Sequence, residues 1–175
     1  MPYFETCIWI LVGLITGSFV NLCIDRLPLQ FAEKDEQLSF LNSPKLSSLL
    51  KNYVRECKLS LIKPTRSFCF FCGYQLRWFE NIPMLSYILI KGRCRTCKVA
   101  LGLRIIFTET MHGIWYGIFG WIFQNWIWSI SAGINFSFLW ILAYCRSHKK
   151  LRIKLYYAGW ILLTMNLLMY LFFIK

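Results

Sequence analysis

Acidic side chains are scarce in this 175-residue chain, which has 8 Asp and Glu residues against 20 Lys and Arg residues. Aspartate occurs only at Asp25 and Asp35, and no acidic residue of either kind follows Glu109. An aspartic protease dyad needs two carboxylates that share a proton in one site. The chain beyond Glu109 cannot supply such a pair, and it also has no G-x-G-D motif.

Three further absences narrow the class of protein. No G-x-G-x-x-G follows an expected strand, so the sequence has no dinucleotide-binding fingerprint. Internal repeats and low-complexity tracts are missing as well. The apolar run from Phe4 to Ile24 has no Lys or Arg before it and no small-residue cleavage site after it, which favours a retained segment over a signal peptide.

Apolar residues are abundant instead. They make up 57% of the chain, against roughly 45–50% in soluble proteins, and the mean hydropathy is +0.48. Four apolar runs each come close to the roughly 20 residues that cross a bilayer. We therefore expect an α-helical integral membrane protein with four transmembrane helices, at Phe4 to Ile24, Ile105 to Phe123, Trp126 to Tyr144 and Leu155 to Ile174.

The basic residues predict the orientation of these helices. Fourteen of the twenty lie between Arg26 and Arg104, and five lie between Arg146 and Lys154. Loops rich in Lys and Arg stay in the cytoplasm, so both termini are expected outside. A net charge of +12 can also indicate nucleic-acid binding. Here the charges flank apolar runs, which favours membrane lipid as the partner and no nucleic acid.

The chain divides into a first transmembrane helix (1–24), a loop with an amphipathic helix (25–65), a metal-binding module (66–104) and three transmembrane helices (105–175). In the loop, Ser43 is expected to cap a helix that has Pro44 in its first turn. Its apolar positions recur at helical spacing. This helix is expected to lie on the inner membrane surface or to pack on the metal-binding module.

The metal-binding module is predicted from four cysteines in the pattern C-x2-C-x21-C-x2-C: Cys69, Cys72, Cys94 and Cys97. Two residues between cysteines allow a tight turn that directs both sulfur atoms at one ion, and two such turns complete a tetrahedral thiolate shell. A closed shell leaves no position for water, which indicates a structural zinc. Two disulfides are the alternative, but cytoplasmic thiols stay reduced.

The segment between the two cysteine pairs holds an apolar stretch, Ile82 to Ile90, that is too short to span lipid. It is expected to form a strand pair or to dip into the membrane interface. Glu80 precedes it, and Glu109 opens the second apolar run, so both carboxylates are placed where the module meets the membrane. An ion pair of Glu80 with Arg77 or Arg93 is the alternative to a chemical role for Glu80.

Glycine spacing predicts how the first two long helices pack. Gly13-x3-Gly17-x3-Asn21 in the first is repeated in reverse order as Glu109-x3-Gly113-x3-Gly117 in the second. Small residues four apart let antiparallel helices approach closely, and this register brings Asn21 to Glu109. We expect a contact between these two, by hydrogen bond or through one water. His112 is expected either to be buried in the bundle or to touch substrate.

Several of these motifs, in order and spacing, resemble one known family. The stretches are "GSFVNLCIDRLP" (Gly17 to Pro28), "CFFCGYQLRWFENIPMLSY", "KGRCRTC" and "GLRIIFTE" (Gly102 to Glu109). They resemble the amino-terminal domain of bacterial prepilin peptidases, inner-membrane enzymes of type IV pilus and type II secretion systems. The resemblance implies a bifunctional enzyme whose aspartic peptidase half removes a leader and whose amino-terminal half methylates the new α-amine with S-adenosylmethionine. This chain resembles only the methylating half.

The resemblance also implies partners, a location and site residues. The substrate would be a type IV prepilin or pseudopilin precursor, with a peptidase half acting in trans. The location would be the bacterial inner membrane, with both termini periplasmic and the main loop cytoplasmic. A non-enzymatic membrane scaffold and a degenerate or truncated relic are the alternatives. Candidate catalytic residues are Glu80, Glu109 and Arg93, and candidate S-adenosylmethionine-binding residues are Gly92, Asn21 and Asn81.

Overall fold

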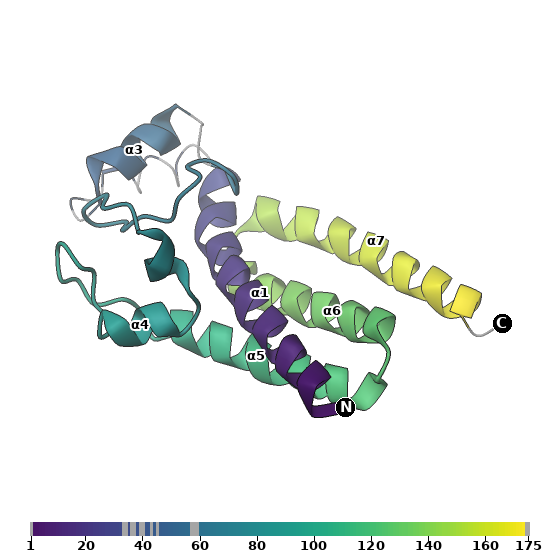
Figure 1. Ribbon diagram of the computed structural model, residues 1–175. Helices are drawn as coiled ribbons and strands as arrows, with labels where there is room; N and C mark the ends of the chain where they lie inside the picture. The colour runs from purple at the N-terminus through teal and green to yellow at the C-terminus, as the bar shows by residue number, and fades with distance from the viewer. Residues whose placement is uncertain are drawn as a thin grey trace.

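The computed structural model describes residues 2–32, 35, 38, 41–42, 44, 46–56 and 60–173. Most of these residues form four long helices: α1 (Pro2–Gln30), α5 (Arg104–Phe123), α6 (Trp126–Cys145) and α7 (Lys149–Phe173). The long helices lie side by side, and both chain ends are at the end of the bundle away from α3 (Figure 1). The shorter elements are α3 (Ser48–Arg55), the 3-10 helix η1 (Trp78–Asn81) and α4 (Leu85–Leu89).

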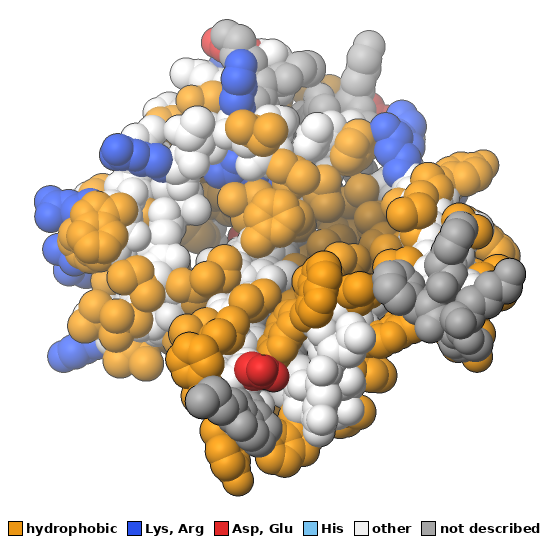
Figure 2. Space-filling model, turned by 45° about the vertical axis from the view of Figure 1, so that its right-hand side comes forward, with side chains coloured by type: hydrophobic (Ala, Val, Ile, Leu, Met, Phe, Trp, Pro, Cys, Tyr) orange, Lys and Arg blue, Asp and Glu red, His pale blue; other side chains and the backbone are white. Residues whose placement is uncertain are grey.

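The mainly helical fold agrees with the prediction, and over the residues that the structure describes a long helix lies on each of the four apolar runs. By length and hydropathy, two of them are long and apolar enough to cross a membrane, Tyr3–Gln30 within α1 and Trp126–Cys145. Figure 2 shows Lys and Arg side chains gathered over one part of the surface, whereas hydrophobic side chains cover most of the rest of that face. The number of membrane passes stays a prediction.

The first helix continues past its expected end at Ile24 because the charges that follow find partners. Asp25 accepts a hydrogen bond from Arg104 at 2.5 Å, which ties α1 to the first residue of α5. The Arg26 side chain is buried, and its guanidinium donates to the backbone carbonyls of Ser60, Leu61 and Pro64. The end of α1 therefore holds the loop that leads into the metal-binding module.

The amphipathic helix of the loop starts later than predicted. Its cap is Ser47, whose hydroxyl accepts a hydrogen bond from the Leu50 backbone N–H, so the expected start at Pro44 is wrong. Ser43 lies outside the described residues. Leu50 and Val54 are buried against Phe68 of the metal-binding module. Of the two expected positions for this helix, the structure therefore has the one in which it packs on the module.

The close antiparallel packing of α1 on α5 confirms the glycine prediction. A Cβ atom added at Gly17 would lie 2.8 Å from the Cα atom of Glu109, and one at Gly13 would collide with the backbone carbonyl of His112. The expected register is wrong by one turn, because Gly17, not Asn21, lies opposite Glu109. The Asn21 amide instead donates to the Ile105 carbonyl at 3.0 Å, so the predicted direct hydrogen bond to Glu109 is not formed.

We predict that Gly13→Ala destabilises the protein by about 1–3 kcal/mol, the usual cost of overpacking a tight interface. The new methyl group meets a backbone carbonyl, which cannot rotate away as a side chain can. Gly102→Ala is the matched control, because a Cβ atom there meets no heavy atom within 4 Å. Thermal unfolding in detergent compares the two variants. Equal midpoints for both would contradict the close approach.

Candidate functional site

The two cysteine pairs form turns of the same design. Gly73 N–H donates to the Cys69 carbonyl at 2.9 Å, and Lys98 N–H donates to the Cys94 carbonyl at 3.0 Å. Gly73 and Lys98 are equivalent positions and both have positive φ, 75° and 57°. Glycine adopts this conformation freely, as expected for Gly73, whereas Lys98 adopts it with a side chain present.

The four sulfur atoms are arranged for a tetrahedral ion. All lie within 4.8 Å of one another, and the Cys69–Cys97 and Cys72–Cys94 separations are both 3.8 Å. Zinc–sulfur bonds of about 2.3 Å in a tetrahedron place the sulfur atoms about 3.8 Å apart. A disulfide needs about 2.05 Å. The geometry fits a structural zinc site and not the two disulfides.

The environments of the first cysteine in each pair differ. Burial raises the pKa of Cys69 to about 12, even though the backbone N–H groups of Cys72 and Phe71 point at its sulfur. Burial also opposes ionisation of Cys94, but the N–H groups of Cys97 and Thr96 outweigh it and lower its pKa to about 7. The two buried sulfur atoms of the cluster thus have different backbone surroundings.

Glu80 joins η1 to the metal-binding module. Its buried carboxylate accepts hydrogen bonds from the Tyr74 hydroxyl at 3.0 Å, the Arg77 N–H at 2.8 Å and Arg95 Nε at 2.5 Å. Burial alone would raise the pKa of Glu80, but these hydrogen bonds and the Arg95 charge hold it below its ordinary value. The expected ion pair exists, but its partner is Arg95 rather than Arg77 or Arg93.

Glu109 joins α5 to the segment that follows η1. Its carboxylate accepts a hydrogen bond from the Met84 N–H at 2.7 Å and a further one from the Ser18 side chain of α1. Among the residues that the structure describes, no Lys or Arg forms an ion pair with it. Glu109 thus differs from Glu80 in having no cationic partner of its own.

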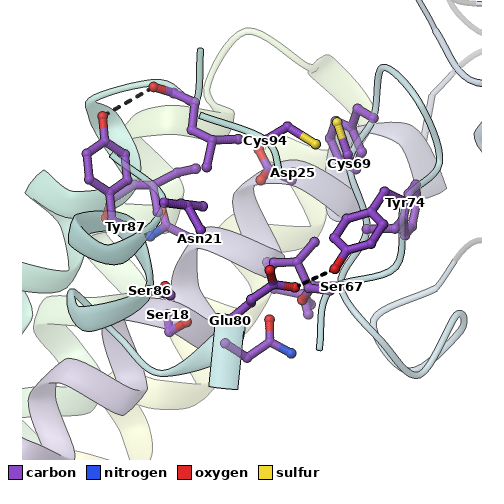
Figure 3. A pocket seen from close by; sticks show the side chains of 18 of the residues that line it. Ser18, Asn21, Asp25, Ser67, Cys69, Tyr74, Glu80, Ser86, Tyr87 and Cys94 are labelled. Atoms are coloured by element: carbon purple, nitrogen blue, oxygen red, sulfur yellow. Dashed lines mark hydrogen bonds between the residues drawn. The ribbon is translucent and has the colours of Figure 1, made fainter. Parts of the chain in front are cut away.

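Both carboxylates line one cavity of about 180 Å³ between α1, α4, the start of α5 and the metal-binding module. Figure 3 shows Ser18 and Asn21 of α1, Glu80 with Tyr74, and Ser86 with Tyr87 of α4 around this space. Its walls combine aromatic and aliphatic side chains with acceptor groups. Asn21 is 6% exposed, and its Oδ1 atom has no hydrogen-bond partner. A ligand with N–H groups and an aromatic part fits this lining chemically.

The cavity brings together four of the six predicted catalytic and cofactor-binding residues: Asn21, Glu80, Asn81 and Glu109. Gly92 and Arg93 do not line it. Gly92 has φ of 63°, and a Cβ atom there would lie 2.8 Å from the Tyr87 ring, so this glycine allows Tyr87 to pack in place. The Arg93 side chain is exposed.

Arg95 lines the cavity and forms an ion pair with Glu80, a pairing that the sequence did not predict. The signal that could have identified it is its place inside the second cysteine pair. From its position between Cys94 and Cys97, the Arg95 side chain reaches the Glu80 carboxylate.

His112 belongs to the helix bundle and not to the cavity. It is fully buried, its Nδ1 atom is 2.8 Å from the Thr108 carbonyl, and the rings of Phe136 and Trp140 surround it. Of its two expected roles, the structure therefore has the buried one.

We predict one zinc ion per chain, lost when Cys97 is changed to Ser. A structural zinc site contributes folding free energy directly, so this variant should also unfold at a lower temperature. Cys7→Ser, at an exposed cysteine of α1, is the control and should keep the metal. Elemental analysis by mass spectrometry measures the zinc content. Full zinc content in Cys97→Ser would contradict the four-thiolate site.

Comparisons with known proteins agree with this geometry. Three similar proteins are named prepilin leader peptidase/N-methyltransferase. The one from Pseudomonas aeruginosa is 34% identical over 119 residues, covering 65% of this chain and 37% of the relative. The one from Burkholderia pseudomallei is 37% identical over 106 residues, covering 59% and 32%. The one from Vibrio cholerae is 31% identical over 127 residues, covering 73% and 42%.

The chain thus spans about a third to two fifths of the length of these relatives. No solved structure matches it. The family model described as Bacterial Peptidase A24 N-terminal domain matches residues 11–123, which include the four cysteines, Glu80 and Glu109. The chain belongs to the family of the bacterial peptidase A24 N-terminal domain.

Proposed function

We propose that this chain is an S-adenosylmethionine-dependent N-methyltransferase domain that methylates the α-amine of processed type IV pilin-like proteins. The observation that carries the proposal is the single cavity in which Glu80, Glu109, Asn21 and Asn81 converge. The names of the relatives give two activities, and the matched part of the chain is the amino-terminal domain of the family. In the family that the sequence motifs resemble, the amino-terminal half methylates, so we assign methyl transfer to this cavity.

Methyl transfer to an amine is an in-line displacement. When bound, S-adenosylmethionine supplies an electrophilic methyl group on a sulfonium. The methyl group would pass to the deprotonated nitrogen of the amine, and the sulfur of the cofactor would keep the electron pair of the broken C–S bond. The amine must first lose a proton to a base, and the two reactants must be held in contact.

The two carboxylates suit different parts of this reaction. Glu80 is held ionised by three donors, so we assign it the binding of the cationic cofactor. Glu109 has no cationic partner among the described residues, so we assign it the amine and its proton. Asn21 and Asn81 would bind polar groups of the cofactor. Gly92 would act indirectly, because it leaves space for the Tyr87 ring that lines the cavity. Arg93 remains a catalytic candidate on the family resemblance alone.

The peptidase reaction is assigned to another chain or another segment. Asp25 and Asp35 are the only aspartates, and Asp25 is paired with Arg104. Leader removal from the prepilin or pseudopilin precursor would then be carried out in trans. We place the protein in the bacterial inner membrane as a four-pass protein, with periplasmic termini and the metal-binding module in the cytoplasm. We propose no nucleic-acid partner.

We predict saturable binding of S-adenosylmethionine to the zinc-loaded protein, weakened at least tenfold in Glu80→Ala. Tenfold corresponds to about 1.4 kcal/mol, within reach of one charged group in a site. Isothermal titration calorimetry in detergent measures it. Glu5→Ala, which removes an exposed carboxylate near the start of α1, is the matched control and should bind as the wild type does.

Failure of the wild type to bind, with zinc content and thermal unfolding intact, would contradict the methyltransferase proposal. It would favour a non-enzymatic scaffold, in which the zinc site only maintains the shape of the metal-binding module. Binding that is equal in wild type and Glu80→Ala would keep the activity but remove Glu80 from the site.

A further inference from the structure

The segment from Ile82 to Gly92 runs along the bundle and then returns. At its start, the Met84 N–H contacts the carboxylate of Glu109 at 2.7 Å. At its end, the Gly92 carbonyl accepts a hydrogen bond from the Leu101 N–H at 2.7 Å. Glu109 is more than one turn inside α5, whereas Leu101 precedes that helix. Met84 therefore lies deeper along α5 than Gly92 does, and α4 lies next to the start of α5 in Figure 1.

Met84 also lies at the level of an apolar stretch of α1. The carboxylate that binds its N–H is hydrogen-bonded to Ser18, next to Gly17. Both residues precede Asp25 and Arg26, the first charged residues after the apolar run of α1. If α1 and α5 cross a bilayer, Met84 is on the hydrocarbon side of these charges.

The chain reverses at Met84, and the polar backbone groups of the turn are paired. Met84 has φ of 57° and ψ of −49°, and the Leu85 N–H donates to the Pro83 carbonyl at 2.6 Å across this three-residue turn. Glu109 accepts the Met84 N–H, and the Ser86 N–H donates to the Ile82 carbonyl at 3.0 Å. Backbone outside a long helix is tolerated at membrane depth only when its polar groups are satisfied in this way.

The short helix α4 has two different faces. Ser86, Tyr87 and Ile90 line the cavity. Leu85, Ile88 and Leu89 point away from it and are 47%, 59% and 63% exposed. No charged residue occurs between Glu80 and Lys91, and Lys91 and Arg93 at the return of the segment are both exposed.

We propose that Ile82–Gly92 is a re-entrant segment whose outer face, Leu85, Ile88 and Leu89, is immersed in the cytoplasmic leaflet. Its occupant is lipid: acyl chains cover the apolar face, and Lys91 and Arg93 meet anionic headgroups. The inference rests on the membrane placement proposed above. It means that α4 is the wall between the bilayer and the cavity, so a substrate held in the membrane reaches Glu109 past α4.

Site-directed photo-crosslinking in proteoliposomes of phosphatidylethanolamine and phosphatidylglycerol tests the inference. A benzophenone amino acid replaces Ile88 or Leu89 in the full, zinc-loaded chain, and mass spectrometry detects lipid adducts. Ile161 of α7, 65% exposed, is the control for membrane contact, and the exposed Lys98 is the control for solvent. We expect adducts at Ile88 and Leu89 at yields comparable to Ile161, and none at Lys98.

Three outcomes would overturn the inference. Adducts at Ile161 but not at Ile88 or Leu89 would leave the chain in the membrane and α4 outside it. Crosslinks from Ile88 or Leu89 to protein would show a protein partner on this face. No adduct at Ile161 either would remove the membrane placement itself. The zinc content of each variant, measured before irradiation, verifies that the metal-binding module is folded.

The role of Glu109 in holding the turn gives a second readout. Glu109→Leu leaves the Met84 N–H without its acceptor, so the adduct yield at Leu89 should fall several-fold. Glu109→Gln retains an acceptor oxygen and should keep the yield. Equal yields in both variants would contradict the anchoring of this segment by Glu109.

Discussion

The close approach of α1 and α5 is the constraint on which the rest of the structure depends. Two glycines of α1 let the backbones meet at Glu109 and His112, where a single Cβ atom would force them apart. That contact places Ser18 at the Glu109 carboxylate, which also accepts a hydrogen bond from the Met84 N–H. The position of α4, and with it one wall of the cavity, follows from helix packing.

The opposite wall depends on the metal-binding module. The second cysteine turn carries Arg95, Arg95 binds Glu80, and Cys69 and Cys94 themselves line the cavity, so the cysteine cluster shapes this wall. Burial on its own would favour a neutral Glu80, but three donors keep it charged. Glu80 and Glu109 thus have different environments in one cavity: Glu80 is already paired with Arg95, whereas Glu109 has no cationic partner among the described residues. Such a difference separates the roles of paired acidic groups in enzymes.

Much of this was predictable, and the errors have physical causes. Cysteine spacing predicted the ligand cluster, and the apolar runs predicted the long helices. Glycine spacing predicted the α1–α5 contact but missed its register by one turn, because a four-residue repeat presents the same small surface after each turn. The helix begins at Ser48 with Ser47 as its cap, and its Leu50 and Val54 pack on Phe68, a tertiary contact that the local sequence does not reveal. Arg95 was missed because sequence distance does not indicate which basic side chain crosses to Glu80.

The most direct test of the central claim is transfer of a tritiated methyl group from S-adenosylmethionine to a peptide that carries the processed N-terminus of a pilin-like protein. The full, zinc-loaded chain in proteoliposomes would be the enzyme, and the label would be located by sequencing the product. The account predicts incorporation at the α-amine that falls roughly a hundredfold in Glu109→Gln, as expected for loss of a general base. Folded, zinc-loaded protein that transfers no label to the amine would contradict it.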